Sequence, residues 1–158
     1  MSFQIAASGI QIVVLELGNE FYGIEVGHIQ EIVRLQPTRS VLDAPDIIEG
    51  VTRLRDTVLP VVDLRRCLGA SDEAASSHGR LVVTDVGSKA VALVVDGVSE
   101  ILTVQPEDIE LPDSLTASES GLILGVAKMD GRLIVILDPY TLVPAQPLVT
   151  ETSTEAAA

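Results

Sequence analysis

The sequence predicts an all-β protein built from two copies of one small, strand-rich unit. Of its 158 residues, 47% are hydrophobic but only 3% are aromatic, so the core has to consist mainly of Val, Ile, Leu and Ala. The β-branched members of that set favour strands. These residues come in short runs separated by glycines and polar pairs, and the same order of runs occurs twice along the chain.

Two pairs of segments carry the duplication. Residues 12–35 align with 81–104 at a constant offset of 69, and the pattern resumes from Gly50 and Gly125 at an offset of 75. Glycines, acids and apolar positions all keep their register, which favours a true repeat over chance. We therefore predict a single domain over residues 10–144 with a first copy at 10–69, a connector at 70–79 and a second copy at 80–144. Residues 145–158 have no period, and we expect a disordered tail.

Each copy opens with two strands in a hairpin. In the first copy, residues 12–17 and 21–26 flank the pair Gly18-Asn19, a link that is typical of a tight hairpin with a primed turn. Gly87-Ser88 stands at the corresponding place in the second copy. We expect the same hairpin in both copies.

A third strand and a crossover come next. The third strand is expected at 32–35, and at 101–104 in the second copy. Within the first crossover, Asp43, Pro45 and Gly50 stand where a helix cap, a first helical turn and a helix end would place them. This spacing predicts a single helical turn over residues 43–50.

Each copy closes with a second hairpin. In the first copy, residues 50–54 and 58–62 flank the turn Arg55-Asp56, and in the second copy 125–129 and 133–137 flank Asp130-Gly131. Five short strands per copy favour a small closed barrel. Strands such as 133–137 are apolar on both faces, so either the two copies pack on each other or one face is covered by a partner. We assign most of this surplus to the interface between copies and the rest to a docking surface.

Charge excludes several classes of partner. The formal net charge of −13 argues against nucleic acid and against an anionic membrane surface. The basic residues are nevertheless uneven, because most of the arginines lie in the first half of the chain: Arg34, Arg39, Arg53, Arg55, Arg65 and Arg66. This asymmetry suits the docking of a protein and equally suits a solvated surface.

The sequence contains no pattern that predicts catalysis. His28 and His78 have no neighbours at metal-ligand spacing, and Cys67 has no nearby base and reads as a buried thiol. No phosphate loop, nucleotide fingerprint or nucleophile motif appears. We expect Glu107 and Asp108 to be solvated in a polar loop. We expect turn-capping roles for the acids that end strands, Asp63, Asp96 and Asp138.

These patterns predict a non-enzyme without cofactor or metal. Apolar runs are far shorter than the ~18 residues that span a bilayer, and the N-terminus lacks the basic residues of a targeting signal. We therefore expect a soluble cytoplasmic protein. A single cysteine fits a reducing compartment.

Three stretches resemble a known family. FYGIEVGHIQEIVRL, APDIIEGVTRLRDTVLPVVDLRRCLG and VALVVDGVSEILTVQPEDIELP are similar to the CheW-type coupling proteins of bacterial chemotaxis, and the likeness covers residues 10–144. The resemblance implies two SH3-like five-stranded barrels around a shared hydrophobic core. It also implies a non-enzymatic adaptor that joins the cytoplasmic tips of chemoreceptors to the regulatory domain of a CheA-type histidine kinase, in arrays at the membrane.

The resemblance also implies two binding surfaces. The receptor-facing groove would be formed by Ile29, Glu31, Arg55, Val58, Val98 and Ile101. The kinase would dock on the first barrel, around Leu15, Ile24 and Val26. From the residues alone, the apolar members of both sets also suit an ordinary core, and Glu31 and Arg55 a solvated rim. A small ligand- or peptide-binding barrel outside chemotaxis stays open as the alternative function.

One turn departs from the family. Where the family usually has Asn-Leu-Arg-Gly, this chain has Arg53-Leu54-Arg55-Asp56. If position 56 needs a left-handed backbone, aspartate there costs about 1 kcal/mol relative to glycine, so Asp56→Gly is expected to raise stability slightly. Receptor choice would differ accordingly. The sequence leaves open the receptors, stimulus and motility output, the oligomeric state, and whether strands are exchanged between the barrels.

Overall fold

The computed structural model describes residues 8–42, 48–64, 68, 79–87, 89–111 and 121–141. Cys67, His78 and the predicted tail lie outside these ranges, as does all but the last residue of the predicted connector. Residues 43–47 of the predicted helical turn are also outside them. The rest of that turn was predicted wrongly, because Ile48 and Gly50 belong to a strand.

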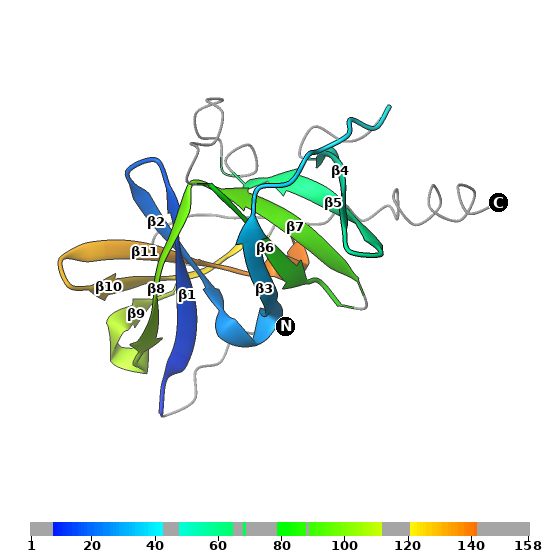
Figure 1. Ribbon diagram of the computed structural model, residues 1–158. Coiled ribbons are helices and arrows are strands. Elements are labelled where there is room, and N and C mark those ends of the chain that lie inside the picture. The colour runs from blue at the N-terminus through cyan, green and yellow to red at the C-terminus, as the bar shows by residue number, and fades with distance from the viewer. Residues whose placement is uncertain are drawn as a thin grey trace.

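The described part of the chain contains eleven strands, of which ten follow the predicted repeat of five per copy and one, β9, is additional (Figure 1). The first copy contributes β1 (Ile10–Leu17), β2 (Glu20–Glu25), β3 (Ile29–Arg34), β4 (Ile48–Leu54) and β5 (Thr57–Asp63). The second contributes β6 (Arg80–Asp85), β7 (Ala90–Val95), β8 (Gly97–Val104), β9 (Ile109–Glu110), β10 (Ile123–Met129) and β11 (Arg132–Leu137). Three 3-10 turns accompany them: η1 (Val26–His28), η2 (Pro106–Asp108) and η4 (Pro139–Thr141).

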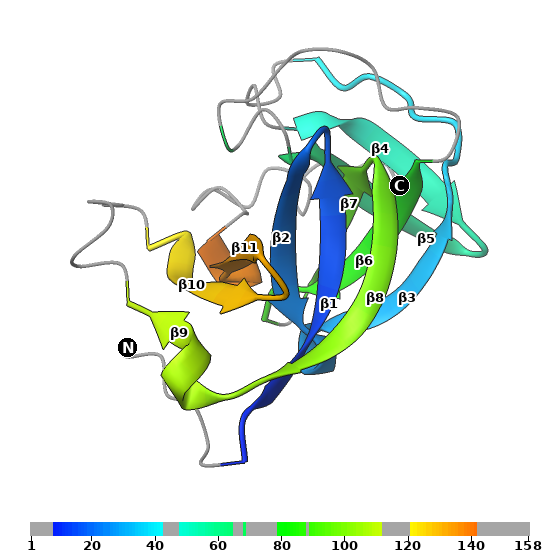
Figure 2. The same ribbon diagram turned by 90° about the vertical axis from the view of Figure 1, so that its left-hand side faces the viewer.

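The strands form two sheets, and each sheet contains strands of both copies. One sheet has the order β8-β1-β2-β11-β10-β9, and the other has the order β3-β6-β7-β5-β4. The first hairpin of each copy therefore lies between strands of the other copy. Figure 2 shows this for β1 and β2, which stand beside β8 of the second copy. Strands are thus exchanged between the two barrels, which answers the question that the sequence leaves open.

The exchange is symmetric in detail. The parallel pair of β5 with β7 sets Val61 opposite Ala92, and the parallel pair of β11 with β2 sets Ile136 opposite Gly23. These two pairs are equivalent, because Ile136 corresponds to Val61 at the offset of 75 and Ala92 corresponds to Gly23 at the offset of 69. The two edge strands also carry a register shift at equivalent positions. In β3 the shift falls between Ile29 and Glu31, and in β8 it falls between Val98 and Glu100. The predicted all-β fold of two related halves is confirmed.

A short backbone bridge closes each barrel. After β3, Arg39 and Val51 exchange two backbone hydrogen bonds of 2.8 Å, which joins the β3 side of the sheet to β4. After β8, strand β9 pairs with β10 in the same way. A Cβ on Gly50 would collide with the Arg39 carbonyl oxygen, which explains the glycine that both copies keep at this point.

Three hydrophobic clusters fill the part of the molecule that the structure describes. One lies inside each barrel, and the third lies between the two sheets, with Leu15, Ile24 and Leu93 among its members. Strand β11 explains the doubly apolar runs: Ile134 packs inside its barrel, Leu137 packs in the shared cluster, and Leu133 is exposed. The predicted shared core is therefore present, with a small apolar surplus on the surface.

Two local expectations need correction. At the β4–β5 turn the residue with positive φ is Arg55 (φ 56°), and position 56 does not have a positive φ. The premise of the Asp56 prediction was therefore wrong. Glu107 and Asp108, expected in a polar loop, are part of the 3-10 turn η2. Glu107 is exposed as expected, whereas the Asp108 carboxylate accepts a hydrogen bond from the Gln105 backbone N–H.

The turn-capping role of the strand-end acids is confirmed in two of three cases. Asp96 accepts a 2.6 Å hydrogen bond from the Gly18 backbone N–H, which ties the β7–β8 corner to the β1–β2 turn. Asp138 accepts one of 3.0 Å from the Tyr140 N–H, at the start of η4. The third acid, Asp63, is buried.

Candidate interaction surfaces

An exposed ion pair joins β3 to the β4–β5 hairpin. The Arg55 guanidinium donates two hydrogen bonds to the Glu31 carboxylate, of 2.5 and 2.8 Å. The hydrogen bond from Arg55 keeps the pKa of the Glu31 carboxyl below its ordinary value, and the same bond raises the pKa of Arg55. The structure thus brings together two of the predicted receptor-facing residues, 24 positions apart in sequence.

The second barrel repeats this ion pair. Glu100 of β8, at the offset of 69 from Glu31, accepts a 2.7 Å hydrogen bond from Arg132 at the start of β11. The Arg132 guanidinium also lies 4.9 Å from the centre of the Phe21 ring, a favourable cation–π arrangement. Sequence reasoning missed Glu100 and Arg132 as site residues. The offset of 69 that aligned Glu31 with Glu100 would have found Glu100, but the offset of 75 places Asp130 at the position of Arg55, so the repeat does not mark Arg132.

The apolar predicted residues lie at the rim of the shared core. Ile29 and Val98 are half-buried and pack against the shared cluster. Ile101 is 58% exposed and stands opposite Val13, a cluster member, so its side chain lies on the face that the two sheets share. Ile32, its equivalent on β3, was missed by sequence reasoning and is 39% exposed. These residues lie on β3 and β8, each an edge strand of its own sheet.

Val58 does not pack at this rim and lies at the margin of the predicted set, on the β4–β5 hairpin. It is 54% exposed and lies on the outer side of the β4–β5 hairpin, and its equivalent in the second barrel, Leu133, is 60% exposed. Val58 lines a groove of about 610 Å³ that is formed by Pro37, Thr38, Arg39, Val51, Thr52, Arg53 and Val58 itself. This groove combines apolar side chains with two arginines.

The predicted kinase-binding residues lie in the core. Leu15 and Ile24 are fully buried in the shared cluster, and Val26 is half-buried against it. Alternating apolar residues mark the buried face of a strand, and the sequence does not show which strands keep a free face. Leu15 and Ile24 therefore offer no surface on which a partner can dock.

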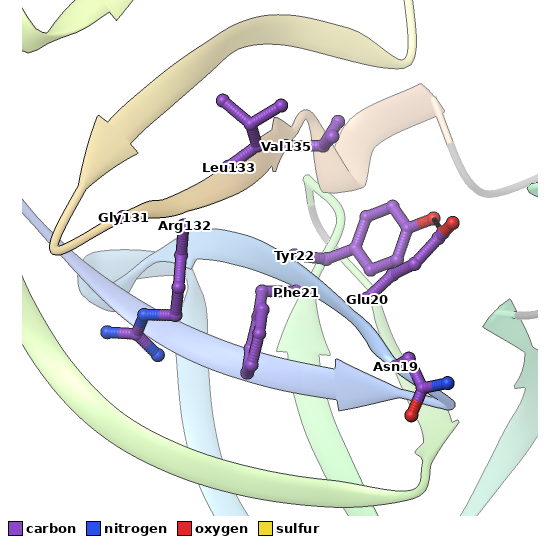
Figure 3. Close-up of a pocket in the computed structure, with 8 residues that line it drawn as sticks. All are labelled: Asn19, Glu20, Phe21, Tyr22, Gly131, Arg132, Leu133 and Val135. Carbon is purple, nitrogen blue, oxygen red and sulfur yellow. Dashed lines mark hydrogen bonds between the residues drawn. The ribbon is translucent and has the colours of Figure 1, made fainter.

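The exposed tip of that same hairpin lines a second groove, shown in Figure 3. It has a volume of about 460 Å³ and is lined by Asn19, Glu20, Phe21, Tyr22, Gly131, Arg132, Leu133 and Val135. The Tyr22 hydroxyl donates a 2.7 Å hydrogen bond to Glu20, and burial together with this carboxylate raises the pKa of Tyr22. Figure 3 shows Tyr22 beside Glu20, with Arg132 and Asn19 at opposite ends of the groove, so the polar groups do not converge on one point as those of a small-molecule site do.

The described ranges contain no group of three or more potential metal ligands, and no helix there is long and apolar enough to cross a membrane. What the molecule does present is a pair of fused barrels with apolar surface residues beside exposed ion pairs. Such surfaces define a class of protein, the protein-interaction module.

The chain belongs to the CheW-like family, whose domain model matches residues 11–146. It is similar to the chemotaxis protein CheW of Klebsiella aerogenes, with 28% identity over 89% of this chain and 85% of the relative. The crystal structure of the scaffolding protein TtCheW from Thermoanaerobacter tengcongensis superposes with a TM-score of 0.79 at 28% identity, covering 87% of this chain and 96% of that one.

The chain is also similar to one part of a longer chemotaxis protein. The chain is 28% identical to a stretch of the chemotaxis protein CheA of Halobacterium salinarum, covering 90% of this chain but 20% of that protein. Family membership makes this chain a chemotaxis scaffold protein and not an enzyme.

Proposed function

We propose that this protein couples the cytoplasmic tips of chemoreceptors to a CheA-type histidine kinase in a cytoplasmic array recruited to the membrane. The observation that carries the proposal is the duplicated surface. Each barrel has a Glu–Arg ion pair between its third strand and its second hairpin, together with an exposed aliphatic residue on each of these elements. An adaptor needs two docking surfaces on one rigid body, and the exchanged strands connect both barrels firmly.

The receptor-facing surface is assigned to Ile29, Ile32, Glu31, Arg55, Val98 and Ile101, with Val58 at its margin. Its exposed aliphatic residues supply association free energy when a partner removes them from water. The Glu31–Arg55 pair, being exposed and charged, orients the partner and discriminates between partners more than it adds affinity.

The kinase-facing surface is assigned to the tip of the β1–β2 hairpin and the start of β11. Leu133 is exposed there, next to Phe21 and Arg132. This keeps the predicted hairpin as the docking element but moves the contact from buried residues to exposed ones. The similarity between this chain and part of a CheA protein supports docking between two related β-barrel units.

Reconstitution tests the coupling role. The CheA-type kinase of the same cell and a receptor-tip fragment are mixed with and without this protein, and kinase autophosphorylation is measured together with co-sedimentation. We expect the chain to bring kinase and receptor into one complex and to change kinase activity only when both are present. A chain that binds neither partner would exclude the proposed role.

A further inference from the structure

Two arginines, Arg39 and Arg53, lie close together on the outer face of the β4–β5 hairpin and of the segment that pairs with β4. Arg39 stands opposite Val51, and Arg53 stands opposite Val58, so the register places all four side chains on one face. We call these four residues the arginine face. Its backbone is fixed by the Arg39–Val51 bridge and by a 2.8 Å hydrogen bond from the Thr52 hydroxyl to the Pro37 carbonyl.

The second barrel neutralises the equivalent positions. Glu110 of β9 stands opposite Val126, where the first barrel has Arg39 opposite Val51, and Lys128 corresponds to Arg53 at the offset of 75. Lys128 Nζ lies 3.2 Å from Glu110 Oε1, so the second barrel has a cross-strand salt bridge where the first has two cations. Arg39 and Arg53 stand at diagonal positions within reach of each other, where two like charges repel, so the fold alone does not favour this arrangement.

Neither arginine has a carboxylate partner within the described ranges. Arg53 Nε donates to the Arg55 carbonyl at 3.3 Å, which leaves its terminal nitrogens available, and both arginines are exposed. In a chain with a net charge of −13, two adjacent cations beside the exposed Val58 form a local exception to the overall field. The complementary surface is a protein segment with two carboxylates and an aliphatic side chain.

We infer that the arginine face binds an acidic segment of the receptor tip, an inference that rests on the proposed coupling function. The face continues the proposed receptor surface, because Val58 and the β4–β5 hairpin belong to both. Diagonal positions on paired strands are about 7–8 Å apart, a spacing that two carboxylates one helical turn apart can match.

The test compares receptor-tip binding by the wild-type chain, Arg39→Glu, Arg53→Asn and the matched control Lys128→Ala at low and high salt. We expect Arg39→Glu to weaken binding about tenfold at low salt and Arg53→Asn about threefold, with both differences shrinking at high salt. Lys128→Ala should bind like the wild type. Arg39→Glu also places a carboxylate beside Arg53, which gives the first barrel the cross-strand salt bridge that the second barrel already has. The melting temperature of this variant should therefore equal or exceed that of the wild type while its affinity for the receptor tip falls.

The outcomes separate the two proposals. If the wild-type chain binds no receptor tip, the coupling role and this inference both fail. If the wild type binds and Arg39→Glu and Arg53→Asn bind equally well at low salt, only the inference is overturned. Circular dichroism of each variant shows that it is folded, and Arg53→Asn replaces an exposed side chain, so its affinity is informative even if Arg39→Glu fails to fold.

Discussion

At the scale of single residues, Arg55 combines two roles that the sequence does not separate. Its side chain holds Glu31, and its backbone adopts a left-handed conformation that arginine rarely adopts. The composition of the turn predicted a tight hairpin correctly. Which of its two residues turns left-handed depends on the twist of β4 and β5 and on the Glu31 carboxylate across the barrel, and neither is visible in a window of four residues.

The geometry of the β4–β5 turn predicts that Asp56→Gly lowers stability, whereas the sequence alone predicted a slight gain. Asp56→Gly should lower the free energy of unfolding by about 0.5 kcal/mol, because glycine gains freedom in the unfolded chain and relieves no strain at position 56. Asp130→Gly is the matched control: Asp130 has a φ of 54°, so glycine relieves strain there and should be neutral or stabilising. Urea denaturation of both variants checks this, and a gain for Asp56→Gly would contradict the turn geometry.

The Glu31–Arg55 pair makes a pH prediction. The pKa of Glu31 is lowered in the folded state, so its contribution to stability is present above its ordinary pKa of about 4.5 and is lost as the pH falls through the folded value. Arg55→Gln removes the cause of that shift. Below about pH 4.5 the melting temperatures of wild type and variant should converge, and at neutral pH the wild type should be slightly higher. The contribution is small because the pair is solvated.

At the scale of elements, the edge strands β3 and β8 hold the candidate site, and the sequence predicted part of it. The family resemblance led to Glu31, Arg55 and Ile101, but polarity along β3 does not follow burial: the polar Glu31 is half-buried, whereas the apolar Ile32 is 39% exposed. Strand β9 and the equivalence of Arg39 with Glu110 were missed, because a two-residue strand exists only through its pairing with β10. Such an element leaves no periodic signal in the sequence.

Ile29 and Ile101 should behave differently although both were assigned to one groove. Ile101→Asp changes an exposed side chain, so it should alter stability by less than about 0.5 kcal/mol while weakening receptor binding. Ile29→Asp places a carboxylate against the shared core and should cost about 1–3 kcal/mol. Chemical denaturation and receptor-tip binding of both variants check the contrast. Equal destabilisation by the two substitutions would show that Ile101 is not a surface residue.

At the scale of the whole molecule, the repeat predicted the halves but not their connectivity. A hairpin that pairs within its own copy and one that pairs with the other copy have the same strands, turns and alternation, because the two copies are alike. The structure takes the exchanged arrangement, with β1 and β2 between β8 and β11 and with β6 and β7 between β3 and β5. Neither copy alone therefore contains a complete sheet, and the shared cluster draws on strands of both.

Exchange predicts how a divided chain behaves. Fragments 1–74 and 75–158 should each fail to form a stable fold alone, because each would expose the edges and apolar faces that the other covers. Mixed at equal concentration, they should assemble into a one-to-one complex with the circular dichroism of the intact chain, and its stability should rise with concentration as mass action requires. Size-exclusion chromatography and thermal melts over a dilution series measure this. A first fragment that folds and stays monomeric would rule out the exchanged topology, because only a barrel closed within one copy survives without its partner.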